Sequence, residues 1–141
     1  MTKIVVVDDD ADTLALVAGA IHLELGYEVL AFLDPVAALE CIIADLSIDA
    51  IVTDEKMPSC TGLQLLERAV KAGYKGHMFV FSGYAGDSMS FDLLQIEMAA
   101  SSNTTHSEVV EKPAMTKLLA VLKQAIDPAD DFGDNFEITD F

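Results

Sequence analysis

The chain has 141 residues, the length of one domain, and 52% of them are apolar, which excludes a compositionally disordered protein. Its net charge of −16, with only eight Lys and Arg residues, argues against nucleic acid and anionic membrane surfaces as partners. No apolar run approaches the roughly 18 residues of a membrane span, and the N-terminal MTKIVVVDDD does not resemble a secretory signal, so we expect a cytoplasmic protein.

The first elements of the chain carry clear strand and helix signals. Residues 4–7 are a continuous β-branched run, typical of a strand that is buried on both faces. Apolar residues then recur at helical spacing over 14–25, and Gly26 predicts the end of this helix. Asp34 followed by Pro35 predicts the start of a second helix, because aspartate is a good N-cap and proline suits the first helical position.

The later elements continue this alternation of strands and helices. Further strands are predicted over 27–32, 50–53, 78–82 and 109–110, and further helices over 63–72, 91–100 and 115–126. Strands that alternate with helices indicate βα units, a parallel sheet and helices on both of its faces. Five such units make a small doubly wound α/β domain, which we place at residues 1–126. Residues 127–141 hold six acids and no base, and this composition predicts a flexible acidic tail.

Polar side chains follow four of the five predicted strands, and open α/β sheets bind ligands beyond the carboxyl ends of their strands. The first strand leads to Asp8, Asp9 and Asp10, the third to Asp54, the fourth to Ser82 and Gly83, and the fifth to Lys112. A single acid at a strand end is an ordinary turn former or helix cap, as Asp10 or Asp12 would be for the first helix. Four such strand ends together are harder to explain in that way.

Carboxylates gathered at one edge of a sheet need a cation. The repulsion energy between two carboxylates about 4 Å apart is roughly 4 kcal/mol at an effective dielectric constant of about 20. Oxygen ligands favour Mg²⁺, or alternatively Mn²⁺, over zinc, and Mg²⁺ often binds phosphoryl oxygens as well. The set therefore predicts a phosphoryl site in which one carboxylate is the nucleophile and Ser82 and Lys112 hold phosphoryl oxygens.

The ordered motifs resemble the receiver domain of two-component response regulators. They are VVDD at 6–9, DEKMP at 54–58 with Gly62, Ser82-Gly83 after an apolar strand, and EKP at 111–113. Their order and the number of elements agree with that family over about residues 3–126. The resemblance implies a flavodoxin-like (βα)5 fold with a five-stranded parallel sheet in the strand order 2-1-3-4-5.

The same resemblance implies a role for each site residue. Asp54 would be the phosphoacceptor, and Ser82 and Lys112 would bind the phosphoryl group. The Mg²⁺ ligands would be Asp8 (through water), Asp9, Asp54 and the main-chain carbonyl of Lys56. The phosphoryl donor would be a phosphohistidine on a sensor histidine kinase or a histidine phosphotransfer protein.

The resemblance also implies how the chain would signal. It would be a single-domain response regulator that acts on an unknown downstream protein, with a homodimer through the fourth and fifth elements as a further option. It would not be an enzyme beyond its own phosphorylation and dephosphorylation.

Three features depart from the family pattern. Val109 stands three residues before the family's lysine, where Tyr or Phe is usual, so the aromatic switch is in question. The 30-residue interval from Ser82 to Lys112 is longer than expected and indicates an altered fourth helix or following loop. The acidic tail stands where an output domain would follow, and the apolar residues among its acids suggest a segment that folds on a partner.

Two other functions stay open at this point. A phosphorylation-independent, receiver-like scaffold would keep the fold without accepting phosphate, and Val109 favours this alternative. A haloacid-dehalogenase-like phosphatase would use an aspartate of the run at 8–10 as its nucleophile, but it leaves DEKMP at 54–58 unexplained. No P-loop or GxGxxG motif is present.

Overall fold

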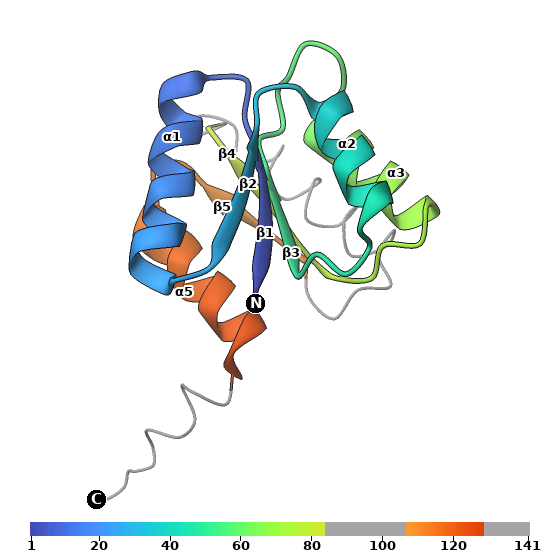
Figure 1. Ribbon diagram of the computed structural model, residues 1–141. Helices are drawn as coiled ribbons and strands as arrows, with labels where there is room; N and C mark the ends of the chain where they lie inside the picture. The colour runs from blue at the N-terminus through green and yellow to red at the C-terminus, as the bar shows by residue number, and fades with distance from the viewer. Residues whose placement is uncertain (84–106, 129–141) are drawn as a thin grey trace, which may run out of the picture.

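The computed structural model describes residues 1–83 and 107–128, which form one sheet with helices on both faces (Figure 1). Five parallel strands lie in the order β2-β1-β3-β4-β5, which confirms the predicted doubly wound, flavodoxin-like fold and its strand order. The strands are β1 (Lys3–Val7), β2 (Glu28–Phe32), β3 (Ala50–Thr53), β4 (His77–Ser82) and β5 (Ser107–Glu111). The predicted helix over 91–100 and the tail from residue 129 onward lie outside the described residues.

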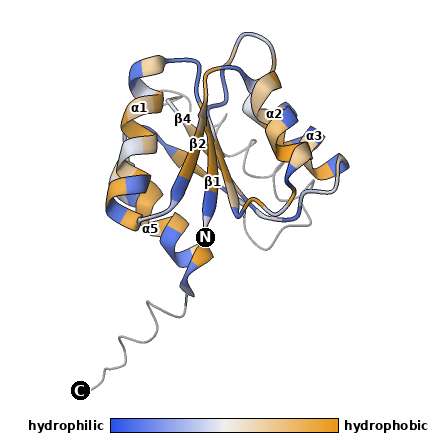
Figure 2. Cartoon of the chain, viewed as in Figure 1, coloured by the Kyte–Doolittle hydropathy of each residue, from blue (hydrophilic) through white to orange (hydrophobic). Residues whose placement is uncertain are grey.

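The helices divide between the two faces of the sheet (Figure 1). One face carries α1 (Ala11–Ala20), its continuation η1 (Ile21–Leu25) and α5 (Met115–Ile126), and the other carries α2 (Pro35–Ala44) and α3 (Gly62–Lys71). Alternate residues of β1 enter the two cores: Ile4 and Val6 pack with α1 and α5, and Val5 and Val7 pack with α2 and α3. Figure 2 shows the hydrophobic strands enclosed between helices of mixed hydropathy. No helix in the described ranges is long and apolar enough to cross a membrane.

Several helix ends lie where the local sequence predicts them. Asp34 caps α2 by accepting a hydrogen bond from the N–H of Val36 (3.0 Å). Asp10 caps α1 in the same way, through the N–H of Thr13 (3.3 Å). Gly26 ends the first helical segment, which consists of α1 and η1. It has the left-handed conformation, with φ of 75°, which glycine adopts without steric cost.

Two helices differ from their predicted form. The predicted helix over 14–25 changes at Ile21 into the π-helical turn η1, because an apolar spacing of three to four residues does not distinguish an α-turn from a π-turn. The helix predicted to begin at residue 63 begins at Gly62. Its N-cap is Thr61, which forms a capping box with Gln64. The sequence contains the signal for this capping box, a threonine that is followed three residues later by a glutamine.

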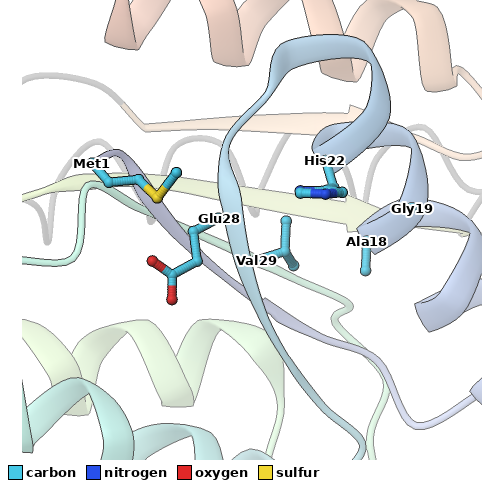
Figure 3. Close-up of a pocket in the computed structure, with 6 residues that line it drawn as sticks. All are labelled: Met1, Ala18, Gly19, His22, Glu28 and Val29. Carbon is cyan, nitrogen blue, oxygen red and sulfur yellow. The ribbon is translucent and has the colours of Figure 1, made fainter.

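A groove of about 440 Å³ lies between the first helical segment and the edge strand β2 (Figure 3). It is lined by Met1, Ala18, Gly19, His22, Glu28 and Val29. The Nδ1 atom of His22 lies 3.0 Å from the carbonyl oxygen of Tyr27, which fixes the ring. Glu28 and Val29 begin β2, so the groove is at the amino end of the strands, opposite to the edge where α/β sheets bind ligands.

Candidate functional site

The carboxyl ends of β1 and β3 bring two aspartates to one edge. The two strands are paired in register, with Val7 opposite Thr53, and the next residues along the chain are Asp8 and Asp54. The N–H of Asp54 donates to the carbonyl of Val7 (2.9 Å), and the N–H of Asp8 donates to the carbonyl of Phe32 on β2 (3.1 Å). Sheet hydrogen bonding therefore continues one residue beyond each strand and holds both aspartates in place.

Three carboxylates meet at this edge and form what we call the acidic cluster. One carboxylate oxygen from each of Asp8, Asp9 and Asp54 lies within 4.8 Å of the other two. Asp8 is buried, Asp54 is half-buried and Asp9 is exposed, so the cluster opens to solvent on one side. The N–H of Asp10 donates to Oδ1 of Asp8 (2.9 Å) and fixes its carboxylate. The structure thus brings together the three aspartates that were predicted to be metal ligands.

Lys112 supplies positive charge to the acidic cluster. Its Nζ lies 2.9 Å from Oδ2 of Asp8 and 3.5 Å from Oδ2 of Asp54. The N–H of Lys112 donates to the carbonyl of Ser82 at the end of β4 (2.8 Å), which places the lysine beside the cluster. One ammonium against three carboxylates leaves an excess of negative charge, and this excess favours binding of a further cation.

The other two predicted site residues differ in their exposure. Ser82 is buried and is the last residue of β4. It lies two positions beyond Val80, which pairs with the last residue of β3, so β4 carries the serine past the end of β3. Lys56 is exposed in the loop between β3 and α3.

The donor set of the acidic cluster suits a hard divalent cation. Its three side chains offer carboxylate oxygens alone, and the main-chain carbonyl of Lys56 would add a fourth oxygen. Magnesium and manganese prefer such oxygen ligands, whereas zinc prefers imidazole and thiolate groups. The residues therefore fit the predicted Mg²⁺ or Mn²⁺.

Close packing holds the loop between Asp54 and Gly62. A Cβ atom on Gly62 would lie 2.2 Å from the carbonyl oxygen of Asp54, so only glycine allows this approach. The N–H of Gly62 donates to the carbonyl of Glu55 (3.0 Å), and the hydroxyl of Thr53 donates to the carbonyl of Asp54 (2.9 Å). The sequence identified Gly62 through its motif. The sequence did not identify Thr53 and Glu55 as residues that hold this loop, because their contacts do not follow the regular residue spacing of a strand or a helix.

The environment of Asp54 makes its carboxylate a stronger base than that of free aspartate. Burial raises the pKa of the Asp54 carboxyl above its ordinary value, the Lys112 ammonium opposes this increase, and the negative charge of Asp8 adds to it. The N–H of Glu55, which donates to Oδ1 of Asp54 (2.8 Å), also opposes the increase. Aspartate carboxylates are among the side chains that act as covalent nucleophiles in phosphoryl transfer.

This raised pKa predicts a pH-dependent effect of Asp54→Asn on stability in EDTA. The folded chain holds the Asp54 proton more tightly than the unfolded chain, so the contribution of Asp54 to stability is lost as the pH rises from about 3.9 through the folded pKa. We expect Asp54→Asn to unfold at a higher urea concentration than the wild type near pH 7, with an advantage that shrinks as the pH falls toward about 3.9. Urea denaturation followed by circular dichroism measures both effects. Asp12 is an exposed acid on α1 and serves as the control. If Asp12→Asn raised the stability near pH 7 as much as Asp54→Asn does, this prediction would be contradicted.

Comparison with known protein families gives a single assignment for most of the chain. Residues 4–123 match the family model of the response regulator receiver domain. The chain belongs to the response regulator receiver domain family. This membership argues against the haloacid-dehalogenase-like phosphatase, which also left DEKMP at 54–58 without a role.

Solved structures of receiver domains share the fold. A response regulator receiver domain protein from Clostridium thermocellum and a CheY-like receiver domain protein from Methanospirillum hungatei JF-1 are each 25% identical, with a TM-score of 0.72; each match covers 94% of this chain and 99% of the other. A complex of CheX with CheY, BeF3 and Mg²⁺ from Borrelia burgdorferi has a TM-score of 0.70 at 17% identity, with 87% of each chain covered. No curated protein matches the sequence.

One departure of this receiver domain from the family pattern lies in the described residues. Val109 is on β5, opposite Val80 of β4, and packs partly buried against the core on the α2–α3 side of the sheet. An aliphatic side chain with a single torsion angle fills this position. A ring that turns between two positions is therefore not available at residue 109.

Proposed function

We propose that this receiver domain accepts a phosphoryl group on Asp54 from a phosphohistidine, with Mg²⁺ bound at the acidic cluster. The observation that carries the proposal is the meeting of three aspartate carboxylates within 4.8 Å, with the ammonium of Lys112 in contact with two of them. The Mg²⁺ ligands would be the carboxylates of Asp8, Asp9 and Asp54 and the main-chain carbonyl of Lys56. The donor would be a sensor histidine kinase or a histidine phosphotransfer protein.

The chain's own groups prepare Asp54 for phosphoryl transfer. The N–H of Glu55 fixes one carboxylate oxygen, and Lys112 lies beside the other. A carboxylate oxygen of Asp54 forms a bond to phosphorus while the P–N bond of the donor breaks, and the electron pair of that bond stays on the imidazole nitrogen. Lys112 and the hydroxyl of Ser82 then hold the oxygens of the transferred group. When bound, Mg²⁺ supplies positive charge that offsets the repulsion between the carboxylates and the phosphoryl group.

The phosphorylated chain would signal through contacts with a downstream protein. Its net charge of −16 disfavours binding to nucleic acid and to anionic membranes. Pairing of two copies through the fourth and fifth elements is a further way in which phosphorylation would be read. The proposal includes a cytoplasmic location and no catalysis beyond the chain's own phosphorylation and dephosphorylation.

Intact-protein mass spectrometry tests the proposal directly. After incubation with Mg²⁺ and acetyl phosphate, we expect one phosphoryl group on the wild-type chain and none on Asp54→Ala. A parallel incubation in EDTA tests the need for the metal and should abolish the addition.

Absence of phosphorylation in the wild type would count against the proposal. If calorimetry then showed that Mg²⁺ binds, the phosphorylation-independent scaffold that Val109 favours would be the better description. Incubation with a phosphohistidine protein as donor separates that scaffold from a receiver that does not accept acetyl phosphate.

A further inference from the structure

Glu55 stands between Asp54 and Lys56 and is held at three points. Its N–H donates to Oδ1 of Asp54 (2.8 Å), its carbonyl accepts from the N–H of Gly62 (3.0 Å), and its carboxylate oxygen Oε1 accepts from the N–H of Leu63 (2.8 Å). The first bond orients the candidate nucleophile. The other two tie the residue to the first turn of α3.

The carboxylate of Glu55 is kept out of the acidic cluster, which consists of Asp8, Asp9 and Asp54. An acid directly after the candidate nucleophile would add to the repulsion among these three if its side chain turned toward them. The amino end of α3 provides it with an N–H donor and with the positive end of the helix dipole.

The contact of Glu55 with Leu63 is additional to the cap of α3. The capping box of Thr61 and Gln64 is complete without Glu55: the N–H of Gln64 donates to Oγ1 of Thr61 (3.1 Å), and the N–H of Thr61 donates to Oε1 of Gln64 (3.0 Å). The N–H of Leu63 is a further first-turn donor that the capping box leaves without a partner, and Glu55 accepts from it across eight residues of the chain. This bond therefore joins the loop after β3 to α3 in addition to completing the helix end.

We propose that Glu55 is a positioning residue that anchors the loop after β3 to α3. Its side-chain bond to Leu63 and its main-chain bond to Gly62 together fix the orientation of the residue. That orientation aims its N–H at Asp54 and sets the direction in which the chain continues to Lys56, whose carbonyl is a proposed Mg²⁺ ligand. The consequences for Mg²⁺ binding and phosphorylation rest on the proposed function, whereas the anchoring of the loop does not.

Three variants of the full chain separate positioning from helix capping. Glu55→Ala removes the acceptor, and Glu55→Gln keeps an oxygen acceptor of the same length. Gln64→Ala is the matched control, because it removes a side-chain bond at the same helix end without touching residues 54–56. Circular dichroism establishes that each variant is folded.

The first readout is hydrogen exchange of the residue-55 amide, measured by NMR without metal and corrected for intrinsic rates. We expect about tenfold faster exchange in Glu55→Ala and a change of less than about threefold in the other two variants. Unchanged exchange in Glu55→Ala would overturn the proposal, as would equal acceleration in Gln64→Ala.

The second readout is Mg²⁺ affinity by isothermal titration calorimetry. We expect about tenfold weaker binding in Glu55→Ala and a change of less than about twofold in Glu55→Gln and Gln64→Ala, as for residues that orient metal ligands. Binding as weak in Glu55→Gln as in Glu55→Ala would overturn the role of the hydrogen bond. A wild-type chain that binds no Mg²⁺ would refute the proposed function, and the exchange of the residue-55 amide would then decide the positioning role by itself.

Discussion

Replacing Gly62 by alanine should destabilise the fold by about 3 kcal/mol, at the upper end of the usual range for overpacking. The added Cβ would lie 2.2 Å from the carbonyl oxygen of Asp54 and 3.0 Å from Cγ2 of Thr53. The closer of these contacts is with the backbone, which cannot rotate away as a side chain can, so the loop that carries Asp54 has to move. Phosphorylation by acetyl phosphate should slow by at least about tenfold, because a displacement of about 1 Å is enough to cost roughly 100-fold in a positioned reaction.

Gly19→Ala is the matched control for this substitution. A Cβ at Gly19, on α1, would meet no atom within 4 Å beyond its chain neighbours and the backbone of its own helix. The greater helix propensity of alanine should then leave the stability unchanged or raise it by up to about 1 kcal/mol. Urea denaturation compares the two variants, and equal stabilities would show that the close approach at Gly62 does not restrain the loop.

Lys112→Met should destabilise the metal-free protein by about 2–3 kcal/mol, somewhat less than the roughly 3–5 kcal/mol for breaking a fully buried pair. The side chain of Lys112 is 20% exposed and that of Asp8 is 4% exposed, so the pair is largely removed from water. Without the ammonium, Asp8 and Asp54 repel each other and lose a charged partner. Urea denaturation in EDTA measures the loss.

The same variant should bind Mg²⁺ at least about fivefold more tightly than the wild type, because an ammonium in contact with two of the carboxylates that would hold the metal opposes binding of a second cation there by about 1 kcal/mol or more. Bound ligand stabilises the folded state in proportion to the logarithm of its affinity, so excess Mg²⁺ should narrow the stability difference between Lys112→Met and the wild type by about 1 kcal/mol. Lys112 thus serves as the counter-ion of the acidic cluster when no metal is bound.

Lys3→Met is the control for charge removal. Lys3 pairs with Asp45 at 3.3 Å, and both side chains are more than one third exposed, at 39% and 37%. An exposed pair of this kind contributes about 0–1 kcal/mol, and it lies outside the acidic cluster. Equal losses in Lys3→Met and Lys112→Met, or weaker Mg²⁺ binding in Lys112→Met, would contradict the counter-ion role.

The local sequence by itself determined most of the elements. The β-branched run at 4–7 predicted a strand buried on both faces, and alternate residues of β1 do pack into both cores. Asp34 with Pro35 predicted the start of α2, and Gly26 predicted the end of the first helical segment. These signals are local because caps and positive φ angles depend on residues within one turn of each other.

The sequence also determined which polar residues share one edge of the sheet. Parallel strands present their carboxyl ends on the same side, so acids after the first and third strands and a lysine after the fifth were expected to lie near one another. Asp8, Asp54 and Lys112 do so. The strand order came from the resemblance to receiver domains, because the alternation of strands and helices does not distinguish among the possible orders.

Only the tertiary structure decided which atoms meet within this edge. Asp8 and Lys112 are 104 residues apart and form a contact at 2.9 Å because β1 and β5 end at the same side of one sheet. The approach of Gly62 to the carbonyl of Asp54 and the reach of Glu55 to Leu63 depend on how α3 packs against the end of β3. Such contacts have no period along the chain, since they arise from the packing of whole elements rather than from the conformational preferences of neighbouring residues.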